Sequence, residues 1–141
     1  MFKLIGNNEL NLDTCITPWT FKHFVSGVYF TYLLKFIKKT DILAFVIYNL
    51  IHLIYELKDY ILTYYYKNTR FNDKGKPNMY YNSLINSIGD LIFGMLGSIL
   101  ILYIIAQNNK ILTNNFFILF TGIYILIALI FFLGFYKLNI G

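Results

Sequence analysis

The stretch SLINSIGDLIFGMLGSILILYIIA, Ser83 to Ala106, begins with polar residues and continues as a run that is almost entirely apolar. Ser83, Asn86 and Asp90 lie within its first two turns if the stretch is helical. At 1.5 Å per residue, a helix of this length measures about 36 Å, and a bilayer's hydrocarbon core is about 30 Å thick. The stretch therefore predicts a transmembrane helix that carries an aspartate near one end.

The composition of the whole chain agrees with this prediction. Of the 141 residues, 57% are hydrophobic and only 13% are charged, whereas soluble proteins average about 25% charged residues. The first twenty residues lack the continuous apolar core of a secretory signal peptide, so we expect them to be retained. We predict an integral membrane protein. Its net charge of +5 is better explained by topology and anionic lipid than by nucleic acid.

Four apolar segments joined by polar connections predict an all-α, four-helix membrane bundle. We expect one transmembrane domain over residues 1–141, with helices at about 19–37, 41–66, 83–106 and 115–137. In this arrangement seven lysines and arginines fall on the side of the two termini and four on the opposite side. The positive-inside rule then places both termini in the cytoplasm.

Ionisable and polar residues from three of the expected helices meet at one depth. They lie near the start of the first helix, in the later half of the second, and in the first two turns of the third. An ionisable residue inside a membrane is costly to insert and is by default a candidate functional site. The predicted ligand or ion cluster consists of His23, Glu56, Asp59, Asn86, Ser87 and Asp90.

Simpler explanations exist for some of these residues. Asn49, His52, Glu56 and Asp59 recur every three or four residues and so share one helix face. His52 lies deepest and has only Glu56 as an expected acidic neighbour, so a purely structural role explains it more simply. Glu56 could pair with Lys58 or Arg70 at the interface, and Asn86 could hold helices together.

Glycines and basic residues complete the predicted arrangement. Gly27, Gly94 and Gly97 share helix faces with the polar residues and would allow neighbouring backbones to approach closely. The link from Lys67 to Met79 is polar and basic, and it contains glycine and proline, so we expect a solvated loop. Its basic residues would face lipid headgroups: Lys67, Arg70, Lys74 and Lys76.

Three motifs resemble those of a known family: FKHFVSGVYF (21–30), YELKDYI (55–61) and YNSLINSIGDLIFGMLG (81–97). They are similar to the His-x-x-x-Gly, Glu and Asn-Ser-x-x-Asp motifs of a small uncharacterised bacterial inner-membrane family, which is itself distantly VanZ-like. The family tends to have Gly-Asp where this chain has Asn82 and Ser83, which removes one carboxylate. The resemblance implies a role in the cell envelope or in the response to lipoglycopeptides. It singles out His23, Gly27, Glu56, Asn86, Ser87 and Asp90.

Three functions remain open from the sequence. The favoured one is binding of a lipid headgroup or an ion by the buried cluster, without chemistry. The second is a small intramembrane enzyme acting on a lipid, with Glu56 or Asp90 as general base or metal ligand and His23 as proton carrier or ligand. The third is a subunit that assembles with itself or with a membrane partner through the Gly94/Gly97 face.

The sequence leaves the cofactor and the metal unknown. The single Cys15 excludes an internal disulfide bond. No Cys–His or His–His spacing indicates a structural zinc site.

Overall fold

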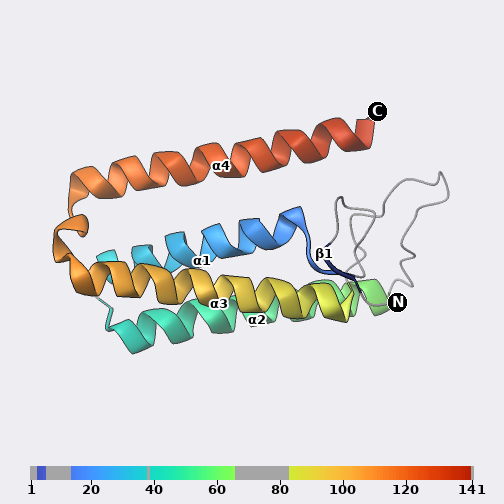
Figure 1. Ribbon diagram of the computed structural model, residues 1–141, viewed down its shortest axis with the longest axis horizontal. Coiled ribbons are helices and arrows are strands. Elements are labelled where there is room, and N and C mark those ends of the chain that lie inside the picture. The colour runs from blue at the N-terminus through green and yellow to red at the C-terminus, as the bar shows by residue number, and fades with distance from the viewer. Residues whose placement is uncertain (1–2, 6–13, 38, 66–82, 141) are drawn as a thin grey trace.

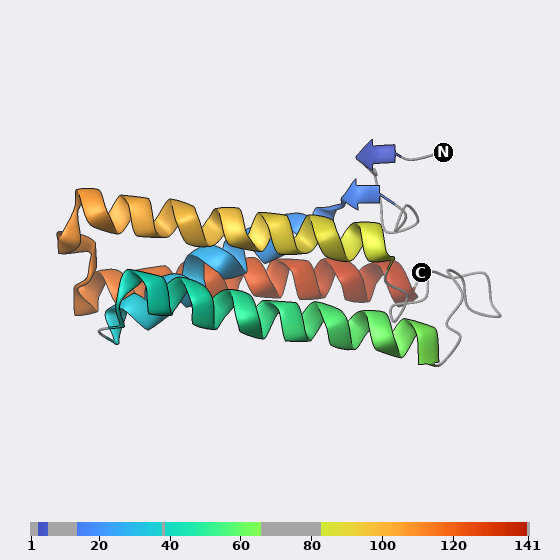
Figure 2. The same ribbon diagram turned by 90° about the horizontal axis from the view of Figure 1, so that it is seen from below.

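The computed structural model describes residues 3–5, 14–37, 39–65 and 83–140. In this part of the chain the fold consists of four α-helices: α1 (Pro18–Phe36), α2 (Asp41–Tyr65), α3 (Leu84–Gln107) and α4 (Asn114–Ile140). Successive helices run in opposite directions, so α1 and α3 begin at the end of the molecule where α2 and α4 finish (Figures 1 and 2). The helices occupy the stretches expected from the sequence, and α4 continues three residues past Lys137. The all-α prediction is therefore confirmed.

Local capping fixes where α1 and α3 begin. Thr17 and Thr20 form a reciprocal capping box at the start of α1, and Pro18 takes the first helical position, where its missing N–H costs nothing. The Ser83 side chain accepts a hydrogen bond from the Asn86 backbone N–H at the start of α3. These caps satisfy backbone N–H groups that have no partner within the first helical turn.

A small strand pair precedes the helices and was not expected from the sequence. β1 (Lys3–Ile5) pairs in parallel with β2 (Thr14–Ile16). Strands of three residues are too short to show a recognisable alternation of polar and apolar residues. β2 lies against α3, where a Cβ at Gly89 would collide with the backbone carbonyl of Cys15.

α1 and α3 cross closely because glycines lie at their contact. A Cβ added at Gly27 would collide with the Gly94 carbonyl, and one at Gly97 would collide with the Phe24 carbonyl. Further along the same interface the Thr31 hydroxyl donates a buried hydrogen bond of 2.9 Å to the Ser98 hydroxyl. Small residues at such crossings let two backbones approach closely and pack well.

The end of the bundle where α3 connects to α4 is closed by apolar and aromatic side chains. Tyr32, Ile101 and Ile105 are buried there, and the Tyr32 hydroxyl donates to the Ile111 carbonyl at 2.9 Å, in the short 3₁₀ turn η2 (Asn109–Ile111). Partly buried phenylalanines of α4 pack against them. We call this set the aromatic cluster: Tyr32, Ile101, Ile105, Phe116, Phe117 and Phe120.

The pattern of burial is inverted relative to a soluble protein. Among the described residues, nine buried residues are polar or charged and six are hydrophobic, glycines not counted. Large aliphatic side chains point outward along the helices, such as Ile42 at 79%, Ile54 at 66% and Ile118 at 68% exposure. Soluble proteins bury their aliphatic side chains and rarely expose such large continuous apolar surfaces.

Two of the described helices are long and apolar enough to cross a membrane: α3 over Leu84–Gln107, and α4 over Asn114–Phe131. Four crossings were expected from the sequence. α1 and α2 are more polar because α1 carries Lys22 and Lys35 and α2 carries four charged residues, among them Glu56.

Candidate functional site

The site begins with a contact between two histidines from different helices. His23 of α1 and His52 of α2 approach with 2.8 Å between His23 Nδ1 and His52 Nε2. Their rings are nearly parallel, at an interplanar angle of 13°. His52 is buried and the His23 side chain is 14% exposed. The α1–α2 interface thus holds two imidazoles whose ring nitrogens face each other.

A buried carboxylate completes a triangle with the two imidazoles. Glu56 lies one turn after His52 on α2, and only 2% of it is exposed. Its Oε1 atom lies 3.5 Å from His23 Nδ1 and 3.5 Å from His52 Nε2. Three donor atoms of the kinds that coordinate metals therefore surround one point.

Asp90 brings α3 into the site from the other side of His23. Its Oδ2 atom lies 3.5 Å from His23 Nε2 and accepts a hydrogen bond of 2.7 Å from the Asn86 side-chain amide. Asp90 Oδ1 is buried and has no hydrogen-bond partner within the described residues, and the same is true of Ser87 Oγ. We call His23, His52, Glu56, Asn86 and Asp90 the polar cluster.

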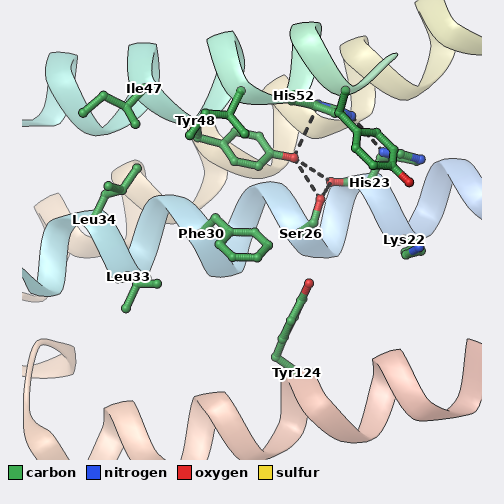
Figure 3. A pocket seen from close by; sticks show the side chains of 12 residues that line it. Lys22, His23, Ser26, Phe30, Leu33, Leu34, Ile47, Tyr48, His52 and Tyr124 are labelled. Carbon is green, nitrogen blue, oxygen red and sulfur yellow. Dashed lines mark hydrogen bonds between the residues drawn. The ribbon is translucent and has the colours of Figure 1, made fainter. Parts of the chain in front are cut away.

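Two hydroxyl groups, those of Tyr48 and Ser26, link the His52 ring to the backbone of His23. The Tyr48 hydroxyl lies 3.4 Å from His52 Nδ1 and 2.9 Å from Ser26 Oγ. Ser26 in turn donates to the His23 carbonyl at 2.8 Å, as Figure 3 shows. The network ties the orientation of the His52 ring to the backbone of α1.

Gly94 makes room for the His52 ring. A Cβ at Gly94 would collide with the imidazole of His52 and would meet the Tyr48 hydroxyl at 3.0 Å. The glycine therefore does two things at once: its carbonyl faces α1, and its missing side chain lets α2 place His52 at the cluster.

A cavity of about 390 Å³ adjoins the two histidines between α1, α2 and α4. One end of it is polar and the other is apolar, as the labelled side chains in Figure 3 show. The polar end is lined by Lys22, His23, Ser26, Tyr48 and His52. The apolar end is lined by Phe30, Leu33, Leu34 and Ile47, and the wall also contains Ile51, Tyr55 and Tyr124.

The structure brings together most of the residues that the sequence singled out. His23, Glu56, Asn86 and Asp90 meet in one place, and Ser87 is buried next to Asn86. Asp59 instead pairs with its neighbour Lys58 at 2.8 Å, and its side chain is 30% exposed. The proposed headgroup-facing residues, Lys67, Arg70, Lys74 and Lys76, lie outside the described residues.

Three residues of the site were not among the candidates predicted from the sequence: Ser26, Tyr48 and His52. The signal for two of them was a spacing of four residues on α2, since Ala44, Tyr48, His52 and Glu56 are all buried. The expected stripe used alternating spacings of three and four, so it contained His52 and Glu56 but added Asn49 and Asp59 and left out Tyr48. A spacing of four rotates by about 40° per step around the helix, so the buried face of α2 drifts and leaves those two residues at its edge.

Comparison of the chain with protein-family models, with curated proteins and with solved structures gives no match. The resemblance to the bacterial inner-membrane family stays a prediction.

Proposed function

We propose that this chain is a multi-pass integral membrane protein whose four helices all lie in the bilayer. The support is the inverted burial, with isoleucine and leucine outside and histidine, glutamate and aspartate inside. α3 and α4 are apolar enough to span independently. α1 and α2 would enter with their polar residues turned toward α3 and toward each other, which lowers the cost of inserting those groups.

The proposed orientation follows from the arrangement of the helix ends. The starts of α1 and α3 lie at the same end of the molecule as the ends of α2 and α4. In the arrangement expected from the sequence, that side has seven lysines and arginines against four on the other. The positive-inside rule places it in the cytoplasm together with both termini.

Cysteine labelling tests this topology. In a Cys15→Ser background, Gly75→Cys and Gly141→Cys should react with an impermeant reagent from one side of the membrane, and Lys110→Cys from the other. Labelling of Gly75→Cys and Gly141→Cys from opposite sides would contradict four crossings.

The ligand that fits the site best is a single membrane lipid with an anionic headgroup. The observation that carries this proposal is one continuous cavity with a polar end at Lys22, His23 and His52 and an apolar end beside Leu34 and Ile47. Its volume falls in the range of about 300–1,000 Å³ that is usual for small-ligand sites. The Lys22 ammonium supplies positive charge where a phosphate would lie, and the apolar end suits an acyl chain.

Assembly through the Gly94/Gly97 face is less well supported than lipid binding. That face already packs against α1 of the same chain, because Gly94 meets Gly27 and Gly97 meets Phe24. A partner would have to use a different surface.

Filling the apolar end of the cavity tests lipid binding. Ile47→Trp places a large side chain in the cavity wall, whereas Leu50→Trp on the same helix adds one on the exposed face, where Leu50 is 54% exposed. After purification in detergent, the wild type and Leu50→Trp should retain about one phospholipid per chain by mass spectrometry, and Ile47→Trp should retain none. Equal lipid content in all three proteins would contradict the proposal.

A further inference from the structure

The nitrogen and oxygen atoms at the centre of the polar cluster are spaced like the ligands of one metal ion. The three edges of the triangle measure 2.8, 3.5 and 3.5 Å, between His23 Nδ1, His52 Nε2 and Glu56 Oε1. The point equidistant from its corners lies about 1.9 Å from each atom, against zinc bonds of about 2.0–2.2 Å to imidazole and carboxylate. An ion slightly out of the plane would reach all three.

We propose that His23, His52 and Glu56 bind one divalent transition-metal ion of the zinc type. Two imidazole nitrogens and one carboxylate oxygen favour zinc, cobalt or nickel over magnesium and calcium, which prefer oxygen ligands throughout. The metal would replace the short contact between the imidazoles, and the 2.8 Å edge would widen toward the roughly 3.3 Å expected between ligands of a tetrahedral site. Metal binding requires no bound lipid, because all three proposed ligands are side chains of this chain.

The surroundings of the two histidines match those of metal ligands. A metal on His23 Nδ1 leaves Nε2 to face the Asp90 carboxylate, which lies 3.5 Å away and is held by the Asn86 amide. A metal on His52 Nε2 leaves Nδ1 to face the Tyr48 hydroxyl at 3.4 Å. Metal-binding histidines almost always direct the second ring nitrogen to such a partner, which fixes the tautomer and the ring orientation. Asp90 and Tyr48 are therefore positioning residues for the metal.

The burial of the ligands points to a bound cation as well. Glu56 and Asp90 are each only 2% exposed, and each has a carboxylate oxygen 3.5 Å from a ring nitrogen of His23. A buried carboxylate is costly unless a cation or hydrogen bonds compensate for the lost hydration. A divalent ion would neutralise both carboxylates at once.

The metal would also meet the cavity. Three protein ligands leave a fourth position of a tetrahedral ion for water or for another ligand, as in zinc sites that bind small molecules. His23 and His52 both line the polar end of the cavity. An oxygen of the ligand's polar group could take that position, which would join metal and ligand binding at one place.

Metal titration of the purified full-length protein tests the proposal. After treatment with EDTA in detergent, the wild type should bind one equivalent of Zn²⁺ by calorimetry, and Co²⁺ should give the visible absorption of a four- or five-coordinate site. Glu56→Gln should lose at least tenfold in affinity. Asp59→Asn is the matched control, because it removes a carboxylate from the same helix outside the triangle, and it should bind as the wild type does. No stoichiometric binding, or equal losses in the two variants, would overturn the proposal.

X-ray absorption of the zinc-loaded wild type provides a test that needs no variant. The spectrum should require two imidazoles and light oxygen or nitrogen scatterers at about 2.0–2.1 Å. Asp90→Asn should keep the one-to-one stoichiometry with a 10- to 100-fold weaker affinity, as expected for a residue that orients a ligand. A spectrum with no imidazole would refute the assignment even if a variant failed to fold. Metal binding that persists in the lipid-free Ile47→Trp protein would separate this site from the proposed lipid function.

Discussion

The aromatic cluster and the polar cluster lie in the same helix bundle, but the first consists of large apolar side chains and the second of polar and ionisable ones. The aromatic cluster packs Tyr32 and Ile101 against α4 near the α3–α4 connection, and its aromatic rings meet at close range, as Tyr32 and Phe120 do at 4.9 Å between centroids. The polar cluster instead buries two histidines and two carboxylates where α1, α2 and α3 meet. Packing of large apolar groups stabilises a fold, whereas buried charges cost stability unless they are compensated. Apolar packing is thus concentrated at one end of the bundle, and the buried polar residues at the α1–α2–α3 contact.

The largest stability effect should come from the aromatic cluster. Tyr32→Ala removes a fully buried side chain and its hydrogen bond to the Ile111 carbonyl, and it should lower the free energy of unfolding by about 3–5 kcal/mol. Ile104→Ala is the control on the exposed side of α3, at 39% exposure. Circular dichroism melting in detergent should show a large drop for the first variant and a small one for the second. Similar drops in melting temperature for both variants would contradict the greater contribution of the buried residue to stability.

Gly94 is expected to contribute both to the stability of the bundle and to zinc binding. Gly94→Ala collides mainly with the movable side chains of His52 and Tyr48, whereas Gly27→Ala collides with the backbone of α3. We expect Gly27→Ala to destabilise the bundle strongly. Gly94→Ala should cost less in melting temperature but at least tenfold in zinc affinity, because it displaces an imidazole. Equal loss of stability with intact zinc binding would show that Gly94 serves packing alone.

Asp90→Asn should affect binding and leave stability nearly unchanged. The amide keeps the hydrogen-bonding capacity of the side chain and removes a buried charge, so the melting temperature of the ligand-free protein should stay close to that of the wild type. Whatever ligand co-purifies with the wild type should be lost or weakened. Leu91→Asn serves as the control because it places the same amide one residue away on a different face. A large drop in melting temperature for Asp90→Asn would favour a purely structural role.

The smallest effect should come from the pair formed by Lys58 and Asp59. The two side chains are 51% and 30% exposed, and they lie 2.8 Å apart near the end of α2. Exposed ion pairs contribute about 0–1 kcal/mol, so Lys58→Met should leave melting and ligand content almost unchanged. A change in ligand content would extend the functional site toward the end of α2.

The helices were predictable because each depends on local sequence. Long apolar runs and polar connections located α1 to α4, and equal depth along antiparallel helices brought His23, Glu56 and Asp90 to one level. Equal depth does not determine rotation about the helix axis. The prediction therefore included Asp59, which faces Lys58, and left out His52, which closes the triangle.

The metal triangle had no local signature in the sequence. Its two histidines are 29 residues apart and belong to different helices, whereas recognisable metal motifs place ligands within a few residues of each other. Glu56 follows His52 at a spacing of four, which puts both on one helix face. The third ligand, His23, comes from α1, which packs closely against α3 at Gly27 and Gly94. Gly94 also leaves room for the His52 ring.

We propose that the polar cluster binds a ligand and that its buried charges lower the stability of the ligand-free protein. The most direct test is the melting temperature of EDTA-treated wild type and Glu56→Gln, each measured with and without one equivalent of Zn²⁺. The metal-free Glu56→Gln protein should melt at or above the metal-free wild type, and zinc should raise the melting temperature of the wild type alone. A metal-free Glu56→Gln protein that melts far below the wild type, together with no response of the wild type to zinc, would contradict the claim.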